Sequence, residues 1–592
     1  PARWIAVPNG GFESSEKPEK WQTQGADVVT ADDAPEGKRY LRSKTGLSAW
    51  QRTGQVPLEP NRFYLFSMWL RSEQKVLVAL GADTDPSVRG LGAARRRIEG
   101  TGGEWKRVGF YFRVPATSSQ LRINLRMFGK KDKGPVDVDD VRVREAPFAE
   151  FARAWDAWRA QWPERDLAPR PGDGRFLQLS VKKLEGRGVP GKPYVIWALG
   201  SSYTNFLGNG ESFVRLLRAR YPDAPTIVYK KHVGNSTPWR FVRGWANQFA
   251  ADELPDLIFV YTIGWNDRLE TMLKELRRRT TADIVVPSIH VRGRGKIDEA
   301  LTGDAKWVVE LKKLCEKYDA EFVANRKEWA EYVTEHKLDK QDMLASKKPT
   351  EVHQNARGAV TILENVVRHF APNDKPGYDP EARERWIERL ATLTERGAKA
   401  TCEFTGRHVM LVGRRTEGGG TARVLVDGKP AGEVAAFVTT YIKPGEKNSG
   451  PHWPRGDKAP HAVTLGKNVV PQTWTIAMTS DTGDFKIEGS VTGADGSGNA
   501  IAPFTSESGQ IVIDPDLWRG VGRRRRGPKK GEPYYHMKRG DTYTFDVIRG
   551  VPAAVSFEAD GEDEAGRFCL PIARNLASGK HTLELVAEGD GE

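Results

Sequence analysis

Cysteine is scarce in this chain. Only three cysteines occur among its 592 residues, namely Cys315, Cys402 and Cys569. Their wide separation excludes a disulfide-dense scaffold and the close cysteine pairs of structural zinc sites. Cys315 lies on the apolar face of a helical pattern over residues 307–318, which predicts a buried thiol. Cys402 and Cys569 both fall in the C-terminal region, where a disulfide between them is feasible.

Long apolar runs are also missing. No stretch reaches the roughly 20 residues that a membrane-spanning helix needs, and no signal peptide is visible in the sequence, which begins at Pro1. We therefore expect no membrane insertion. The expected location is secreted or periplasmic.

Acidic residues are outnumbered by basic ones. The chain has 91 Lys and Arg against 78 Asp and Glu, a formal net charge of +13. Such a surface attracts polyanions over long range. The densest basic run, residues 523–530, has no recognised nucleic-acid-binding motif beside it and is interpreted as a flexible loop. We expect no nucleic acid as partner, and an acidic polysaccharide as the polyanion.

Glycine and proline are abundant, with 60 and 36 residues, and the length predicts several domains. We divide the chain into a β-sandwich (1–146), a helix and linker (147–174), an α/β domain (175–372) and a C-terminal β-sandwich with a leading helix (373–592). In the helix expected over Phe148–Trp162, three tryptophans form one stripe, which is typical of packing against a neighbouring domain.

The first 146 residues show alternating polar and apolar runs between turn signals, which predicts a sandwich. The runs Asn9–Glu13, Tyr64–Arg71 and Val136–Arg142 resemble jelly-roll carbohydrate-binding modules. This resemblance implies a structural calcium where the two ends of the module meet, with Glu13 and Asp140 as candidate ligands; a simple polar contact is the alternative. Tryptophans of the module are candidates for stacking on sugar rings, although most are expected in its core.

The middle of the chain alternates strand-like and helical patterns, which predicts a parallel sheet covered on both faces. Four short polar pieces follow in order: Gly200–Thr204, Val233–Asn235, Gly264–Asp267 and Val352–Asn355. The first three directly follow strand-like runs, and the fourth precedes an amphipathic helix. Ligands bind at the carboxyl ends of such strands, so we expect the pieces to meet at one edge of the sheet.

These pieces contain the groups that a serine hydrolase needs. Ser202, on a turn between a strand and a helix, is the candidate nucleophile, and His353 is the base that takes its proton. The Gly234 N–H and the Asn266 amide are placed to hold an oxyanion. His232 and His290 also lie near strand ends and are interpreted as structural or substrate-facing.

On these four pieces, residues 172–370 resemble the SGNH (GDSL-like) hydrolases. The resemblance implies a flavodoxin-like parallel fold, Ser202 as nucleophile, His353 as general base, and an oxyanion hole from the N–H groups of Ser202 and Gly234 and the side chain of Asn266. No cofactor is implied for the reaction. Two positions depart from the family pattern: Ser201 replaces an aspartate, and Thr350 stands where the triad aspartate is expected.

The group that orients His353 is left open by the sequence. The candidates are Glu351, Asp342 and a backbone carbonyl, and alternation along an extended segment would aim Glu351 away from the side of Thr350. Candidate substrate contacts are Trp265, Arg292 and Arg294, the arginines belonging to a basic loop that follows a strand.

The combined features predict a multidomain serine esterase that removes acyl groups, mainly acetyl, from a polysaccharide through an acyl-enzyme on Ser202. Two alternatives remain. The first is an esterase or lipase that acts on small or lipid esters. The second is a polysaccharide-binding protein whose hydrolase site has decayed, as Thr350 would allow.

Overall fold

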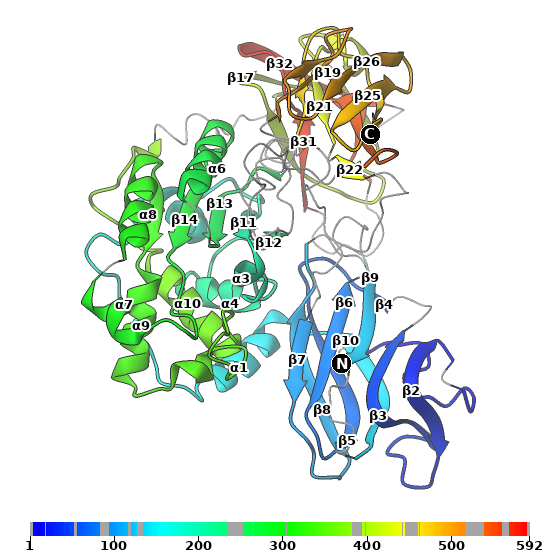
Figure 1. Ribbon diagram of the computed structural model, residues 1–592. Coiled ribbons are helices and arrows are strands. Elements are labelled where there is room, and N and C mark those ends of the chain that lie inside the picture. Colours follow the sequence, from blue (N-terminus) through cyan, green and yellow to red (C-terminus); the bar gives the residue numbers. More distant parts are fainter. Residues whose placement is uncertain are drawn as a thin grey trace.

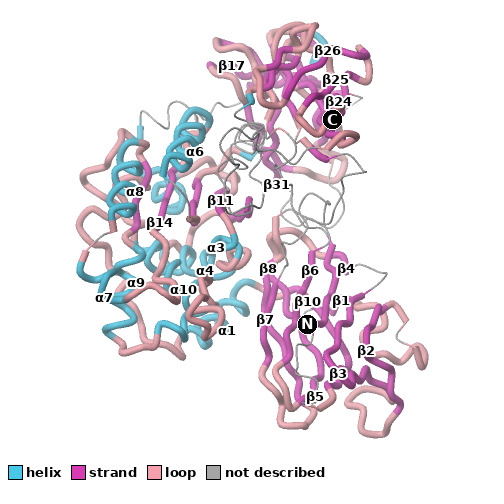
Figure 2. The backbone as a smooth tube through the Cα atoms, in the orientation of Figure 1, coloured by secondary structure: helices cyan, strands magenta, loops and turns pink. Residues whose placement is uncertain are grey.

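The computed structural model describes residues 4–17, 19–51, 56–82, 94–116, 120–126, 134–233, 253–263, 266–303, 305–381, 394–396, 398–440, 442–444, 460, 462–515, 538–558 and 567–588. Strands dominate both terminal parts, and the long helices belong to the middle part (Figures 1 and 2). Most of the leading helix expected after residue 380, and the basic run 523–530, lie outside the described residues. None of the described helices is both long and apolar enough to cross a bilayer.

The N-terminal part is a β-sandwich, as predicted. Its strands are β1 (Trp4–Ile5), β2 (Trp21–Thr30), β3 (Arg39–Gln51), β4 (Val56–Pro57), β5 (Phe63–Ser72), β6 (Val76–Ala82), β7 (Ala94–Ile98), β8 (Lys106–Arg113), β9 (Gln120–Arg126) and β10 (Val136–Glu145). Strand β3 pairs with β10 through its first half and with β9 through its second half, so it links the two layers. Inward residues such as Phe66, Met68 and Val138 are fully buried between the layers.

The middle part contains a five-stranded parallel sheet with the order β12-β11-β13-β14-β15. Its strands are β11 (Tyr194–Gly200), β12 (Ile227–Val233), β13 (Leu257–Tyr261), β14 (Asp283–Pro287) and β15 (Ala320–Val323). The helices of the described residues are α1 (Phe148–Arg159), α2 (Gln178–Lys182), α3 (Ser202–Asn205), α4 (Glu211–Arg220), α6 (Asn266–Arg279), α7 (Ile297–Thr302), α8 (Lys306–Lys317), α9 (Asn325–Glu335) and α10 (Ala356–Arg368). The parallel sheet expected from the alternating patterns is therefore present.

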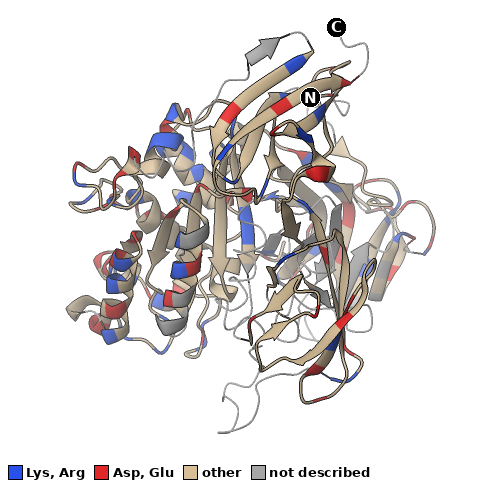
Figure 3. Cartoon of the chain, turned by 90° about the horizontal axis from the view of Figure 1, so that it is seen from above, with Lys and Arg blue, Asp and Glu red and all other residues tan. Residues whose placement is uncertain are grey.

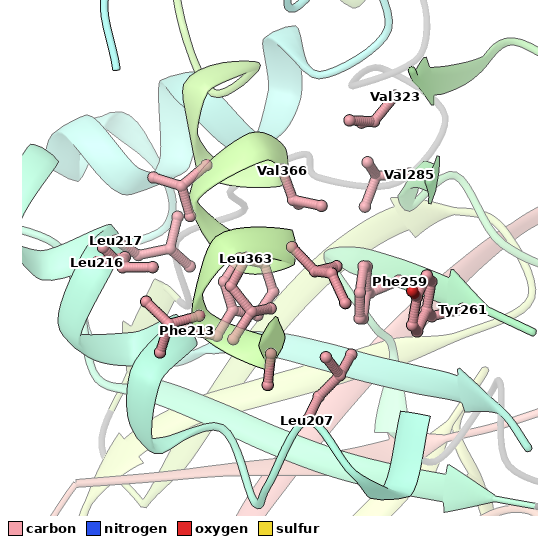
Figure 4. Close-up of a cluster of buried hydrophobic side chains, with 14 of the residues drawn as sticks. Leu207, Phe213, Leu216, Leu217, Phe259, Tyr261, Val285, Val323, Leu363 and Val366 are labelled. Carbon is pink, nitrogen blue, oxygen red and sulfur yellow. The ribbon is translucent and has the colours of Figure 1, made fainter. Parts of the chain in front are cut away.

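Successive side chains of each strand serve opposite faces of this sheet. In β11, Ile196 and Ala198 join the core formed with α4, α9 and α10, whereas Trp197 joins the core formed with α6 and α8. Figure 4 shows residues of α4 and α10 packed over the strands. Cys315 belongs to the α8 core and is fully buried, as predicted. Both faces are covered, which explains why the strands are apolar throughout.

The C-terminal part contains two groups of strands, each with its own buried cluster. The first group is β16 (Thr394–Arg396), β17 (Lys399–Thr405), β18 (Val409–Arg414), β19 (Thr421–Val426), β20 (Lys429–Pro430), β30 (Ala554–Ser556), β31 (Arg567–Ala573) and β32 (Lys580–Glu588). The second group, inserted between β20 and β30, is β21 (Phe437–Thr439), β22 (Lys443–Pro444), β23 (Thr464–Leu465), β24 (Gln472–Met478), β25 (Asp484–Gly489), β26 (Gly493–Asn499), β27 (Phe504–Thr505), β28 (Ile511–Ile513) and β29 (Thr542–Arg549).

Cys402 and Cys569 do not form the disulfide that was feasible from the sequence. Cys402 lies on β17 opposite Leu583, and Cys569 lies on β31 opposite Val412, in a different sheet. The three cysteines all lie within the described ranges, and none of them is part of a disulfide.

The N-terminal sandwich packs directly against the α/β part. Phe63 of β5 stacks on Phe151 of α1 at a centroid distance of 4.4 Å, and Phe63 belongs to the same core as the sheet. The Trp155 indole N–H donates to Ser212 Oγ at 3.0 Å. The predicted helix is thus present as α1, and its tryptophan stripe faces a neighbouring domain.

Arg113, at the end of β8, is the buried polar centre of this contact. Its guanidinium donates to the carbonyl oxygens of Asn61 (3.1 Å), Asn209 (3.4 Å) and Ile227 (2.6 Å). Burial lowers the pKa of Arg113 to about 10, with Glu211 and Tyr229 opposing the shift, so it stays protonated at neutral pH. One cation therefore satisfies carbonyl groups from both sides of the contact.

Replacing Arg113 with Met should lower the thermal unfolding midpoint, because each buried carbonyl left without a donor costs about 1–3 kcal/mol. Arg62→Met is the matched control, since its ion pairs with Glu59 and Glu145 are exposed and should contribute less than about 1 kcal/mol. Calorimetry of both variants beside the parent chain makes the comparison. Equal midpoints for the two variants would contradict the role given to Arg113.

Candidate active site

Ser202 lies on a tight turn at the carboxyl end of the central strand β11. Gly200 ends the strand, and a Cβ added there would lie 2.1 Å from Thr204 Oγ1 and 2.4 Å from the Tyr261 carbonyl oxygen. Only glycine fits so close an approach. The Thr204 hydroxyl donates to the Tyr261 carbonyl at 2.5 Å and ties the start of α3 to the end of β13. Ser202 follows on the exposed side of the turn.

The structure brings His353 to Ser202 across 151 positions of sequence, with 2.9 Å between His353 Nε2 and Ser202 Oγ. His353 lies just before α10, whose first turn is capped by the Asn355 side chain accepting from the Gly358 N–H at 3.0 Å. The serine and the histidine expected to act together are therefore adjacent.

Glu351 lies beside the other ring nitrogen of His353. Its Oε1 is 3.3 Å from His353 Nδ1 and accepts the N–H groups of Val352 (2.9 Å) and His353 (3.0 Å). Its Oε2 accepts from the Ser346 hydroxyl at 2.6 Å. Burial would raise the pKa of Glu351, but these hydrogen bonds and the nearby His353 outweigh it, so the pKa lies below its usual value. The carboxylate therefore stays ionised into mildly acidic conditions.

The alternation expected for this segment was wrong. Residues 349–353 form no strand, because Glu351 N–H bonds back to the Lys348 carbonyl at 2.9 Å in a turn. The turn brings the carboxylate back toward the ring. Asp342, the other candidate, pairs instead with Lys347. Of the candidates named from the sequence, Glu351 is the one whose carboxylate lies beside the His353 ring.

The segment around His353 is held at several points. The Ala345 N–H donates to the His353 carbonyl at 2.9 Å, and the Asn355 N–H donates to the Met343 carbonyl at 3.0 Å. Buried Gln354 donates from its amide to the Tyr203 carbonyl at 2.8 Å, one residue after Ser202. The histidine and the serine are thus connected through backbone as well as through their side chains.

Two aromatic residues that were not predicted as part of the site flank the His353 ring. Phe206 stacks on it with centroids 4.4 Å apart and an interplanar angle of 11°, while 39% of Phe206 stays exposed. Tyr203 lies 5.5 Å away and is buried. Both follow Ser202 within one helical turn, and that proximity was the available signal.

The two other histidines have structural partners. His290 is fully buried, and its Nδ1 lies 2.7 Å from the Tyr261 hydroxyl. Burial, with the charges of Arg292 and His353, lowers its pKa to about 3, so it is neutral. His232 Nε2 lies 3.0 Å from Glu253.

Other predicted site residues are only partly visible. Gly234 and Trp265 lie outside the described residues. Asn266 begins α6, but its side chain is not among those described. The oxyanion hole thus stays a prediction. Arg292 and Arg294 are exposed on the loop after β14.

The two candidate calcium ligands of the N-terminal module, Glu13 and Asp140, have protein partners. Glu13 Oε1 accepts the N–H groups of Lys38 (2.9 Å) and Arg39 (2.7 Å), and Asp140 pairs with Arg107 (2.5 Å) and Arg142 (2.6 Å). Within the described ranges, no group of three or more His, Cys, Asp or Glu side chains is arranged to hold a metal. These carboxylates form polar contacts, the alternative kept open from the sequence.

Several aromatic residues of that module are covered by other side chains. Trp21 is buried, and the guanidinium groups of Arg107 and Arg71 lie over the rings of Trp69 and Trp105 at 5.7 and 4.6 Å. The Tyr111 hydroxyl donates to Glu150 at 2.6 Å. These rings serve the packing of the module, as expected for most of them.

The arrangement of Ser202, His353 and Glu351 has the chemistry of an activated serine. The histidine is within reach of the hydroxyl proton, and a carboxylate faces its opposite nitrogen. Carboxyl ends of parallel strands surround the group, which is where open α/β sheets bind ligands.

Comparison with known proteins identifies the N-terminal part. Residues 6–132 match the family model of a carbohydrate binding domain, so the chain carries an N-terminal carbohydrate-binding module. No curated protein matches the chain.

Three similar solved structures illustrate the overlap. The first is TmCBM61 in complex with beta-1,4-galactotriose (19% identity, 24% of this chain and 100% of that chain, TM-score 0.20). The second is the N-terminal cellulose-binding domain of Cellulomonas fimi beta-1,4-glucanase C (18% identity, 24% of this chain and 99% of that chain, TM-score 0.19). The third is a Stig cyclase from Fischerella (17% identity, 25% of this chain and 99% of that chain, TM-score 0.21).

A fluorophosphonate probe, which phosphonylates activated serines, should attach once to the native chain, at Ser202. Ser202→Ala should abolish the adduct, and His353→Ala should slow its formation about 100-fold or more, because the hydroxyl loses its base. Ser201→Ala is the matched control, since that buried neighbour only accepts the Tyr203 N–H. Peptide mass spectrometry locates the adduct, and equal labelling of the native chain and His353→Ala would contradict the pairing.

Proposed function

We propose that this chain is a serine esterase of the SGNH (GDSL-like) type that removes acyl groups, mainly acetyl, from a polysaccharide. The observation that carries the proposal is the row of side chains from Ser202 through His353 to Glu351. Ser202 Oγ lies 2.9 Å from His353 Nε2, and Glu351 Oε1 lies 3.3 Å from His353 Nδ1. The carbohydrate-binding module supports a sugar polymer as the substrate. The order of the five parallel strands, 2-1-3-4-5 in chain numbering, is the flavodoxin-like order that the resemblance implies.

In the first half-reaction, Ser202 Oγ attacks the ester carbonyl carbon while its proton moves to His353 Nε2. Glu351 holds the ring by its Nδ1 side and stabilises the imidazolium that forms. The tetrahedral intermediate then collapses, the bond to the sugar oxygen breaks, and His353 returns the proton to that oxygen. The deacylated polymer leaves, and the acyl group stays on Ser202.

In the second half-reaction, His353 takes a proton from water, whose oxygen attacks the acyl carbon. Collapse breaks the bond to Ser202 Oγ, which recovers the proton, and acetate is released. The negative oxygen of both intermediates needs nearby donors. The Ser202 N–H is one candidate, and Gly234 and Asn266 are the others that the family resemblance implies. The proposed reaction needs no cofactor.

We also propose that the protein acts outside the cytoplasm, because acylated polysaccharides of the size that a carbohydrate-binding module engages are extracellular polymers.

Figure 3 shows Lys and Arg interspersed with Asp and Glu along the helices of the α/β part. The net charge of +13 is therefore no reason by itself to propose nucleic acid as partner.

Acetate release from acetylated xylan, mannan, pectin and algal polysaccharides tests the esterase directly. The native chain should release acetate from at least one polymer, and Ser202→Ala should reduce kcat about 10⁴-fold or more, because acyl-enzyme formation is lost. Short-chain lipid esters are assayed in parallel. Retained polymer binding without release from any substrate would instead favour the non-catalytic binding protein.

Glu351→Gln should lower kcat about 10²- to 10⁴-fold with little change in KM, because the amide cannot stabilise the imidazolium. Asp342→Asn is the matched control and should retain activity, since Asp342 pairs with Lys347. The measurement is the initial rate of acetate release against substrate concentration. Equal losses in the two variants would show that Glu351 does not orient His353.

A further inference from the structure

The loop after β14 is fastened to the segment that carries Glu351 and His353. The Gly293 N–H donates to the Glu351 carbonyl at 2.8 Å, and a Cβ on Gly293 would lie 2.5 Å from the Pro349 carbonyl oxygen. The Lys340 ammonium donates to the Gly295 carbonyl. Backbone contact therefore fixes the loop beside the candidate active site.

Arg292 is the exposed residue of this loop next to the contact, between buried Val291 and buried Gly293. Its positive charge acts on the hydroxyl of Tyr203, whose ring centroid lies 5.5 Å from that of His353. Burial raises the pKa of Tyr203, and the charge of Arg292 acts against that shift. The Arg292 charge also contributes to the lowered pKa of buried His290. The positive charge of Arg292 thus acts on both Tyr203 and His290.

The donors of Arg292 are not used up by these contacts. A guanidinium carries five N–H groups, and a phenol oxygen accepts at most two. Within the described part of the chain, no carboxylate pairs with Arg292. Glu351, the nearest acidic residue along the loop contact, is occupied by Ser346, backbone N–H groups and His353. Arg292 is therefore exposed on a loop bonded to the segment of Glu351 and His353, and no described carboxylate takes up its charge.

We propose that Arg292 is a specificity residue that binds a carboxylate of the substrate, so that the esters cleaved at Ser202 are those of an acidic, uronate-containing polysaccharide. This inference rests on the proposed function. A planar guanidinium matches a carboxylate through two parallel hydrogen bonds, which a lysine cannot reproduce.

The exposed surface of Phe206 beside His353 suits the rest of the sugar. Phe206 covers the His353 ring and remains partly exposed, giving an apolar surface against which a sugar ring can pack. A sugar residue over Phe206 with its carboxylate toward Arg292 would span His353. The ester to be cleaved then lies on or beside the acidic sugar, within reach of Ser202.

The test compares one polymer in two charge states: an acetylated polyuronate, and the same polymer after reduction of its carboxyl groups and re-acetylation to the same degree. The native chain should show kcat/KM about 10-fold or more higher on the charged form. Arg292→Gln should lower kcat/KM on the charged form about 10- to 100-fold, mainly through KM, and change the neutral form less than about twofold. Arg292→Lys should recover only part of the loss.

Lys296→Gln is the matched control, because it removes one positive charge from the same loop while its side chain pairs with Glu299 at 3.4 Å. It should behave as the native chain on both polymers. Equal rates of the native chain on both polymers would overturn the inference and leave the esterase intact. Equal losses of Arg292→Gln on both polymers would show a purely structural role through Tyr203, which also overturns it. No release from either polymer would overturn the esterase, and the inference with it.

Discussion

The close approach of Gly200 to β13 is the constraint on which the candidate site depends. A strand can lead directly into a helix at this point only if its last residue lets the neighbouring Tyr261 carbonyl and the Thr204 hydroxyl come within 2.5 Å of where a Cβ would be. That turn places Ser202 at the exposed carboxyl end of the central strand. From there Tyr203 contacts His353 and Gln354, and Phe206 covers the histidine ring. Ser202, Tyr203 and Phe206 thus owe their positions to one glycine.

Electrostatics around His353 come from a short loop rather than from the sheet. Glu351 gathers four contacts, from Ser346, two backbone N–H groups and the His353 ring, and they keep its carboxylate ionised despite partial burial. An orienting group fixed in this way loses little entropy when the imidazolium forms. The neighbouring His290 is neutral because it is fully buried, so it adds no competing charge. The candidate site thus contains one half-buried histidine beside Ser202 and one fully buried, neutral histidine.

The carbohydrate-binding module and the α/β part share a core and a buried cation. Phe63 of the module belongs to the hydrophobic core of the sheet, and Arg113 satisfies carbonyl groups on both sides. A contact of this kind is costly to open, because separating the parts would expose aromatic surface and leave the carbonyls without their donor. The module is therefore held as part of one packed unit with the candidate site.

Much of this molecule could be predicted from the sequence because it depends on local patterns. The alternation of polar and apolar residues predicted the N-terminal sandwich, and the apolar runs predicted the parallel strands. The order of the polar pieces at the strand ends indicated Ser202 and His353 as candidate site residues. Local patterns could not provide the carboxylate beside His353, the absence of a disulfide between Cys402 and Cys569, or the contacts of Glu13 and Asp140. Each depends on a turn, a sheet pairing or a guanidinium contributed from elsewhere in the chain.

The sequence by itself determined which groups can react, since strand and helix periodicity place them. Only the tertiary structure decided which charges meet, because a distance of 3 Å between side chains is set by packing and not by spacing along the chain.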